Sequence, residues 1–175
     1  MKAIKKIVDK YLVLALPIDL ITVILIWLSC MYFPIFEIVL NSKPDNLNIL
    51  SNIIGASISL AGFVLASLTI IVSIRSNVKA KLPENAETPL ELFFSVGVYS
   101  TIVRVFAIAI IELVLCFLVS YVIWILSMNI YNQTLTNFLI CLIYLIVVSS
   151  IRSLFVMFLL IAMDKKPTGN NGYKK

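Results

Sequence analysis

The sequence predicts an all-α integral membrane protein, a four-helix transmembrane bundle with cytoplasmic helical extensions. Two observations predict this class. Of 175 residues, 61% are apolar and only 13% are charged, so a water-soluble fold would expose large apolar patches. The apolar residues also gather in four runs, and each run is long enough to cross a hydrocarbon layer of ~30 Å as a helix. We therefore expect one membrane domain over residues 1–163, followed by a tail.

The four runs cover residues 11–33, 53–74, 105–128 and 135–163. The first follows a lysine cluster, as a signal peptide would, but its apolar stretch is too long and no cleavage site follows, which predicts an uncleaved helix. The fourth is longer than a crossing needs, so its part beyond Arg152 should protrude on the cytoplasmic side.

Two further segments lie on the same side. The sequence Thr88-Pro89-Leu90-Glu91 matches a capping box with proline at the first helical position, which predicts an inner-surface helix over residues 89–103. Residues 164–175 mix Pro, Gly, Asn and Lys without periodicity and predict a disordered basic tail.

Basic residues predict the orientation of the chain, because short loops rich in Lys and Arg stay in the cytoplasm. The first and third loops together hold only Lys43, whereas the N-terminus, the second loop and the tail are basic. Both termini should therefore be cytoplasmic, in a bacterial inner (plasma) membrane. The following residues should bind anionic lipid headgroups: Lys2, Lys5, Lys6, Lys10, Arg75, Lys79, Lys81, Lys165 and Lys166.

The composition argues against an enzyme. Histidine is absent, which removes the commonest general base and metal ligand. Cys30, Cys116 and Cys141 stand singly in separate apolar runs and form no CxxC pair, so free thiols are expected. We expect no catalytic residue, cofactor, metal site or direct nucleic-acid contact.

Charged residues inside the spans are the first candidate site. Asp19, Glu112 and Arg152 come to a similar depth when residues are counted from the outer ends of their spans, and intramembrane charge indicates function by default. We predict a Glu112–Arg152 ion pair that Asp19 joins or competes for. The alternatives are that Arg152 extends to the headgroups, and that the pair is structural rather than a proton relay.

A stripe of small residues in the second span is the second candidate. Its members recur at alternating steps of four and three, which places them on one helical face: Gly55, Ser59, Gly62, Ala66, Thr69 and Ser73. Small residues let helices approach closely, so we predict packing against a helix of the same chain. The alternative is a stripe that faces a symmetry axis and lines a pore.

The sequence resembles a known family of small membrane subunits. The segment Gly55-Ala56-Ser57-Ile58-Ser59-Leu60-Ala61-Gly62, the boundary at Arg75, the four spans and the basic ends are similar to the membrane component of the Kiwa antiphage-defence system, the KwaA family. This resemblance implies a homo-oligomer, a tetramer in that family, that works with a cytoplasmic DNA-binding partner.

Two functions follow as hypotheses. One is an oligomeric membrane sensor or anchor for a cytoplasmic partner in bacterial antiphage defence, with Phe93 and Phe94 on the docking surface. The other is a pore or channel that permeabilises or depolarises the membrane. A liposome flux assay would separate them, because an anchor should not conduct.

Overall fold

The structure is a computed structural model that describes residues 14–32, 42–77 and 98–164. These residues form four α-helices, α2 (Ala15–Tyr32), α3 (Lys43–Asn77), α5 (Val98–Leu126) and α6 (Asn132–Asp164), with a 3-10 turn η3 (Ser127–Asn129) between the last two. All four helices are long and apolar enough to cross a membrane. The predicted all-α, four-span fold is confirmed, and the chain is a multi-pass membrane protein.

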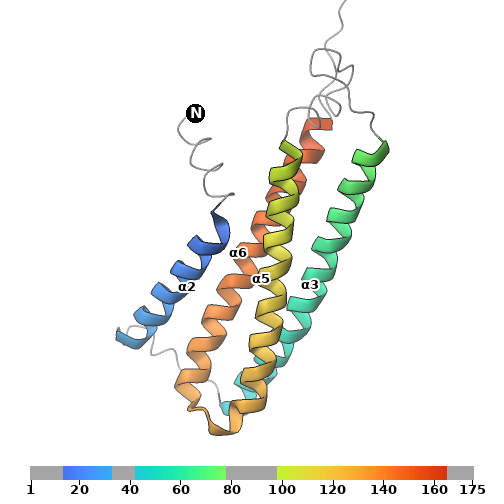
Figure 1. Cartoon of the computed structure of the whole chain (residues 1–175). Coiled ribbons are helices and arrows are strands. Elements are labelled where there is room, and N and C mark those ends of the chain that lie inside the picture. The colour runs from blue at the N-terminus through green and yellow to red at the C-terminus, as the bar shows by residue number, and fades with distance from the viewer. Residues whose placement is uncertain (1–13, 33–41, 78–97, 165–175) are drawn as a thin grey trace, which may run out of the picture.

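The helices run alternately in opposite directions (Figure 1). We call the end that holds η3 and the start of α3 the turn end, and the opposite end, where α3 stops and α5 begins, the far end. The start of α2 and the end of α6 both point toward the far end. An even number of crossings places these two ends of the described chain on the same side of a membrane.

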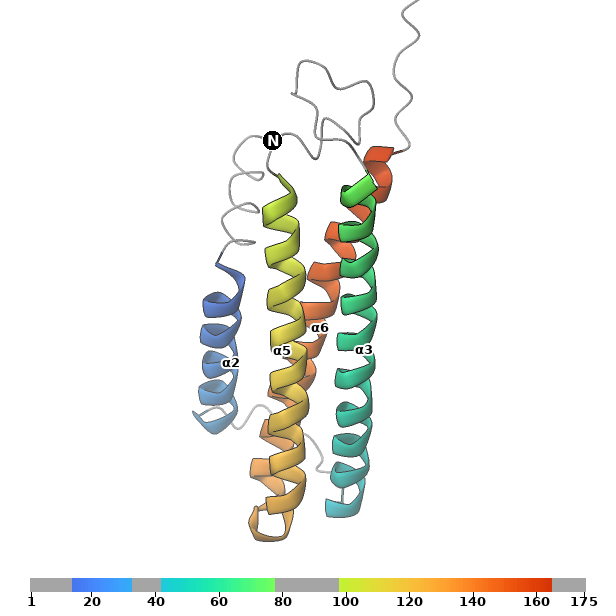
Figure 2. The same cartoon turned by 45° about the vertical axis from the view of Figure 1, so that its right-hand side comes forward.

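The apolar core is built from three helices rather than four. Its fully buried side chains come from α3, α5 and α6, for example Val64, Phe106, Leu113 and Leu139. In the described part of the chain, α2 adds no residue to this cluster. It packs chiefly against α6, on the side of the bundle opposite α3 (Figure 2). The bundle is therefore a three-helix core with a fourth helix attached to one side.

Helix α3 begins earlier than the apolar run suggested, at Lys43 instead of residue 53. The carboxylate half of a capping box explains the start: the Ser42 backbone N–H donates a hydrogen bond to Asp45 Oδ2 at 3.2 Å, and the Ser42 hydroxyl donates to the same oxygen at 2.6 Å. The first contact satisfies a backbone N–H at the helix start, and Asp45 lies where the helix dipole favours a carboxylate. The polar first turns of α3 are thereby helical although they are not apolar.

The early start of α3 ties the helix to the turn between α5 and α6. Lys43 Nζ donates to the carbonyls of Met128 at 3.4 Å and Ile130 at 3.2 Å. Asn46 Nδ2 donates to Asn132 Oδ1 at 2.7 Å and to Thr136 Oγ1 at 3.1 Å. Carbonyls at a helix C-terminus lack partners within the helix, so a lysine there satisfies them. At the far end, the Arg75 guanidinium lies 3.8 Å from the ring centre of Tyr99 and joins α3 to α5.

Candidate functional site

Asp19, Glu112 and Arg152 meet inside the bundle, each from a different helix. Arg152 Nη1 forms an ion pair with Asp19 Oδ2 of α2, and Arg152 Nη2 forms one with Glu112 Oε2 of α5. The exposed fractions of Asp19, Glu112 and Arg152 are 2%, 3% and 4%. Both predicted contacts are present, and Arg152 does not extend to the end of the bundle.

A serine one helical turn from Arg152 completes the contacts of the glutamate. Ser149 lies three residues before Arg152, so both side chains project from one face of α6. The Ser149 hydroxyl donates to Glu112 Oε2, the same oxygen that Arg152 contacts. In the described part of the chain, Glu112 Oε1 and Arg152 Nε are buried without a hydrogen-bond partner. One oxygen of the glutamate therefore holds both contacts.

Arg152 is the centre of the triad. Two carboxylates, Asp19 and Glu112, face its one guanidinium. A charged group in the apolar interior is costly unless it is paired, and Arg152 is shared between two partners. The fourth ionisable residue near the spans, Arg104, is exposed on α5.

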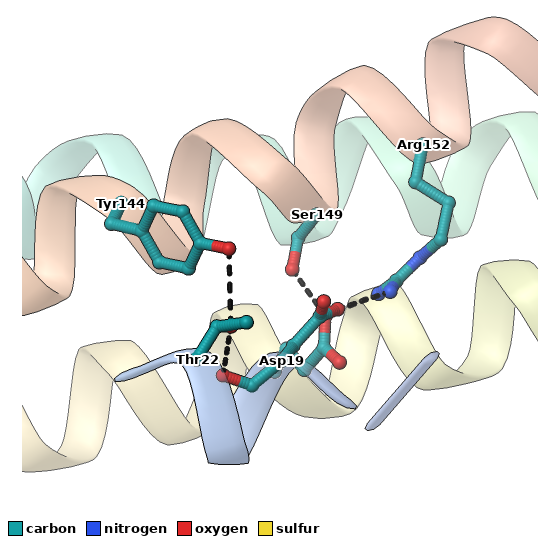
Figure 3. A network of polar contacts seen from close by, with 6 residues as sticks. Asp19, Thr22, Tyr144, Ser149 and Arg152 are labelled. Carbon is teal, nitrogen blue, oxygen red and sulfur yellow. Dashed lines mark hydrogen bonds and ion pairs between the residues drawn. The ribbon is translucent and has the colours of Figure 1, made fainter. Parts of the chain in front are cut away.

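A second polar connection lies beside the triad (Figure 3). The Tyr144 hydroxyl of α6 donates to Thr22 Oγ1 at 3.0 Å, and Thr22 Oγ1 donates to the backbone carbonyl of Asp19 at 2.8 Å. Thr22, Tyr144 and Ser149 were not among the site residues predicted from the sequence. Same-face spacing would have suggested two of them, since Thr22 and Ser149 each lie three residues from a charged member of the triad.

We call these six residues the polar clasp: Asp19, Thr22, Glu112, Tyr144, Ser149 and Arg152. The polar clasp is important for the attachment of α2 because few residues of this helix are buried, namely Ala15 and Asp19. Toward the turn end, the ring of Trp27 contacts Phe138 with 4.6 Å between ring centres. Between these two contacts, the Cys141 thiol of α6 donates to the Val23 carbonyl of α2 at 3.9 Å. The polar clasp, this thiol contact and the Trp27–Phe138 contact attach α2 to the three-helix core.

The small-residue stripe of α3 is not where we predicted it. All six members are exposed in the chain: Gly55, Ser59, Gly62, Ala66, Thr69 and Ser73. A Cβ atom added at Gly55 or Gly62 would meet no atom within 4 Å. The prediction that the stripe packs against a helix of the same chain is therefore wrong.

The face of α3 that packs within the bundle shows the same alternation of three and four residues as the stripe, shifted by two positions toward the N-terminus. Its buried residues include Ile53, Ser57, Val64, Ser67 and Ile71. Two residues turn a helix by about 200°, since 3.6 residues complete one turn. The stripe is consequently on the side of α3 directly opposite the core. Hydroxyls of the packed face bond within the helix, for example from Ser57 to the carbonyl of Ile53 at 2.6 Å.

Other predicted features lie outside the described residues. They comprise the proposed docking residues Phe93 and Phe94, the capping box at Thr88, the tail beyond Asp164, and most of the lipid-binding set: Lys2, Lys5, Lys6, Lys10, Lys79, Lys81, Lys165 and Lys166. Of the predicted inner-surface helix, residues 98–103 are described, and they form the first turns of α5.

Among the described residues, no three His, Cys, Asp or Glu side chains gather as a metal ion would require. No known family, curated protein or solved structure matches the chain.

Proposed function

We propose that the chain is a small oligomeric inner-membrane sensor and anchor that reports membrane disturbance to a cytoplasmic partner in bacterial antiphage defence. The observation that carries this proposal is the unequal attachment of the helices. The core of α3, α5 and α6 is apolar and tightly buried, whereas α2 is attached mainly by the polar clasp. A weakly attached helix is the element that a change in the bilayer would move first.

The way α2 is attached supports this role. A change in bilayer thickness acts on a helix through the mismatch with its apolar length, and tilting is one response to it. Because α2 adds no described residue to the apolar core and contacts α5 and α6 through the polar clasp, a tilt of α2 would act first on the contacts of the clasp.

Spin-label distances test whether α2 is the element that moves. In a background where Cys30, Cys116 and Cys141 are alanine, one label pair is placed at Tyr32 and Met128, which are both exposed. The control pair is Ser51 and Met128, which joins α3 to the turn end. In nanodiscs of short-chain and long-chain lipids, the Tyr32–Met128 distance should change while the control distance stays constant. Equal behaviour of the two pairs would contradict the proposal.

The partner is tested separately. The basic ends of the chain would hold its inner face against anionic lipid, and Phe93 and Phe94 would dock a cytoplasmic protein there. Replacement of both phenylalanines by serine should abolish co-purification of that protein and leave the oligomer intact. A plaque assay on cells that express the chain with its partner tests the defence role, which the resemblance to the KwaA family implies.

A pore is the second candidate, and the exposed stripe of α3 favours it. Ser59, Thr69 and Ser73 carry hydroxyls on a face that the chain itself leaves uncovered. In a homo-oligomer with α3 around the symmetry axis, these hydroxyls would line a polar path. Purified protein in liposomes should then pass ions, and Gly62→Leu should block the flux. A sensor or anchor without a pore should leave the liposomes sealed.

A further inference from the structure

An apolar cavity of about 390 Å³ lies between α2, α5 and α6. Helix α6 forms its floor, because the residues of α6 that line it, for example Leu142, are all buried or half-buried. The exposed lining residues belong to the other two helices: Leu20 and Ile24 of α2, and Leu115 and Val119 of α5. The cavity therefore opens between α2 and α5, on the outer surface of the bundle.

The opening faces hydrocarbon, since α2, α5 and α6 are all long and apolar enough to cross a membrane. The wall is apolar as well: Glu112 reaches the cavity, but its carboxylate is turned to Ser149 and Arg152. An acyl chain of a membrane lipid is apolar and narrow, and lipid surrounds every such opening in a bilayer.

The size of the cavity favours an acyl chain over a helix of a second copy. Its lining residues on α2 run from Leu16 to Trp27, a length of about 16 Å. A helix about 10 Å wide and equally long would occupy roughly 1,250 Å³, about three times the volume of the cavity. A second copy could place only single side chains there.

An exposed arginine marks where the head of such a lipid would lie. Arg104 is exposed on α5, and no carboxylate among the described residues pairs with it. Arg104 precedes Leu115 by 11 residues, or about three helical turns, so both lie on the same face of α5. They are about 16 Å apart along the helix, close to half of a hydrocarbon layer of ~30 Å. A lipid with its phosphate at Arg104 therefore has an acyl chain long enough to reach the opening at Leu115.

We propose that the cavity holds one acyl chain of an anionic phospholipid whose phosphate is bound by Arg104. The guanidinium would donate two hydrogen bonds to phosphate oxygens. The chain would follow the exposed face of α5 and enter between α2 and α5 toward Trp27. An anionic head is favoured over a zwitterionic one, because the zwitterionic head carries a cation of its own.

This inference deepens the proposed function, and its role in sensing rests on that function: an acyl chain between α2 and α5 would couple the packing of the bilayer to the position of α2. Binding is measured below without reference to movement of α2. If the lipid binds but the Tyr32–Met128 distance does not respond to lipid thickness, the sensing proposal fails and the site stands; the opposite result removes the site alone.

Quenching of Trp27 fluorescence measures the binding, because Trp27 lines the cavity. The chain has two tryptophans, so Trp124→Phe leaves Trp27 as the single reporter, and Trp27→Phe leaves the exposed Trp124 as the control for general contact with lipid. The proteins are reconstituted in phosphatidylcholine vesicles. The vesicles contain the same small mole fraction of a lipid brominated toward the ends of its acyl chains, either phosphatidylglycerol or phosphatidylcholine.

At Trp27, brominated phosphatidylglycerol should show an affinity about fivefold higher than that of brominated phosphatidylcholine, as one cation near a membrane surface implies. At Trp124 the two lipids should quench alike. Arg104→Gln should remove the preference, whereas Arg75→Gln, which removes an arginine at the same end of the bundle but on α3, should retain it. Val119→Phe, which narrows the cavity from its exposed rim, should remove the preference at Trp27.

Equal quenching of Trp27 by the two lipids would overturn the proposal. An equal loss of preference in Arg104→Gln and Arg75→Gln would do so too, because it would indicate general attraction to a basic end, and an unchanged preference in Val119→Phe would remove the chain from the cavity. Quenching that ignores the head, together with dissociation of the oligomer by Val119→Phe in native mass spectrometry, would place a second copy there instead. If Val119→Phe does not fold, the comparison of Arg104→Gln with Arg75→Gln still decides, since both arginines are exposed.

Discussion

Arg152 connects the three helices on which the candidate site depends. Its two terminal nitrogens are directed to carboxylates on two different helices, α2 and α5. The planar guanidinium suits this role, because a lysine ammonium has no fixed fork of donors for two separate acceptors. The loss of Arg152 and the loss of either carboxylate should therefore change the free energy of unfolding by different amounts.

The first prediction compares these losses. Arg152→Met removes the guanidinium that contacts two buried carboxylates and should lower the free energy of unfolding by about 3 to 5 kcal/mol. Asp19→Asn leaves one carboxylate paired with one guanidinium, so its cost should be clearly smaller. Unfolding by steric trapping in bicelles would measure both. An equal cost of the two substitutions would show that the charge balance of the triad does not matter.

A charge exchange tests the contact between Glu112 and Arg152 itself. The double variant Glu112→Arg and Arg152→Glu restores opposite charges across α5 and α6, and it should assemble better than either single variant. Size-exclusion chromatography in a mild detergent gives the measure. Damage that simply adds up in the double variant would argue against direct contact.

The triad could be predicted from the sequence, but its neighbours could not. Ionised residues are rare enough in apolar spans that counting residues to equal depth brings Asp19, Glu112 and Arg152 together. Hydroxyl residues such as Thr22, Tyr144 and Ser149 are common in membrane helices and bond readily to their own backbone. Their cross-helix partners depend on the rotation of each helix, which the sequence does not specify.

At the scale of the helix, α3 explains why the stripe was misplaced. In a water-soluble protein the polar face of a helix identifies the outside, but both faces of α3 mix apolar residues with small residues and hydroxyls. The stripe and the packed face have the same alternation of three and four residues and differ by two positions. Periodicity therefore indicates two opposite faces and does not say which one packs within the chain.

Neighbouring residues on these two faces give the second prediction. Ala61 is 5% exposed on the packed face, and Gly62 is exposed on the stripe. Ala61→Leu should overpack the core and cost about 1 to 3 kcal/mol. Gly62→Leu should leave the stability of the single chain nearly unchanged, because open space surrounds it. Thermal unfolding of the detergent-solubilised monomer, followed by circular dichroism, compares the two.

The Gly62→Leu variant also tests how the chains assemble. If chains associate through the stripe, Gly62→Leu should dissociate the homo-oligomer in native mass spectrometry although the monomer remains stable. An intact oligomer would place the interface on another face.

The capping box at Ser42 gives the third prediction. Ser42→Ala removes the hydroxyl that donates to Asp45, and Asp45→Ala removes the acceptor; each should cost about 0.5 to 2 kcal/mol. Hydrogen exchange should increase in the first two turns of α3 and not near Ile71. Uniformly increased exchange along α3 would show that the cap supports more than the helix start. The sequence contains this signal as Ser42-Lys43-Pro44-Asp45, which lies outside the apolar runs that predicted the spans.

For the molecule as a whole, the sequence predicted the number of spans but not their unequal packing. Length and hydropathy determine that four helices cross the membrane. They do not distinguish a symmetric bundle from three helices with a fourth at the side, because lipid-facing and helix-facing surfaces have similar composition. Few residues attach α2, chiefly those of the polar clasp and the Trp27–Phe138 pair, so the difference depends on single side chains.

The orientation in the membrane is the fourth prediction. The bias of lysine and arginine predicts that both termini are cytoplasmic and that the turn end is outside. In a cysteine-free background, Met128→Cys at the exposed turn end should react with an impermeant thiol reagent added to intact cells. Gly172→Cys in the tail should react only after the cells are opened. External labelling of the tail would reverse the model of topology.

The separation of the triad along the chain has a consequence for biosynthesis. Asp19 and Arg152 are 133 residues apart, so at a synthesis rate of ~5–20 residues per second roughly 7 to 27 s pass between them. During this interval the ribosome has delivered the aspartate but not its cation. The ion pair that attaches α2 to α6 can therefore form only after Arg152 has been made. The first span to be synthesised is consequently attached late, when α6 is complete.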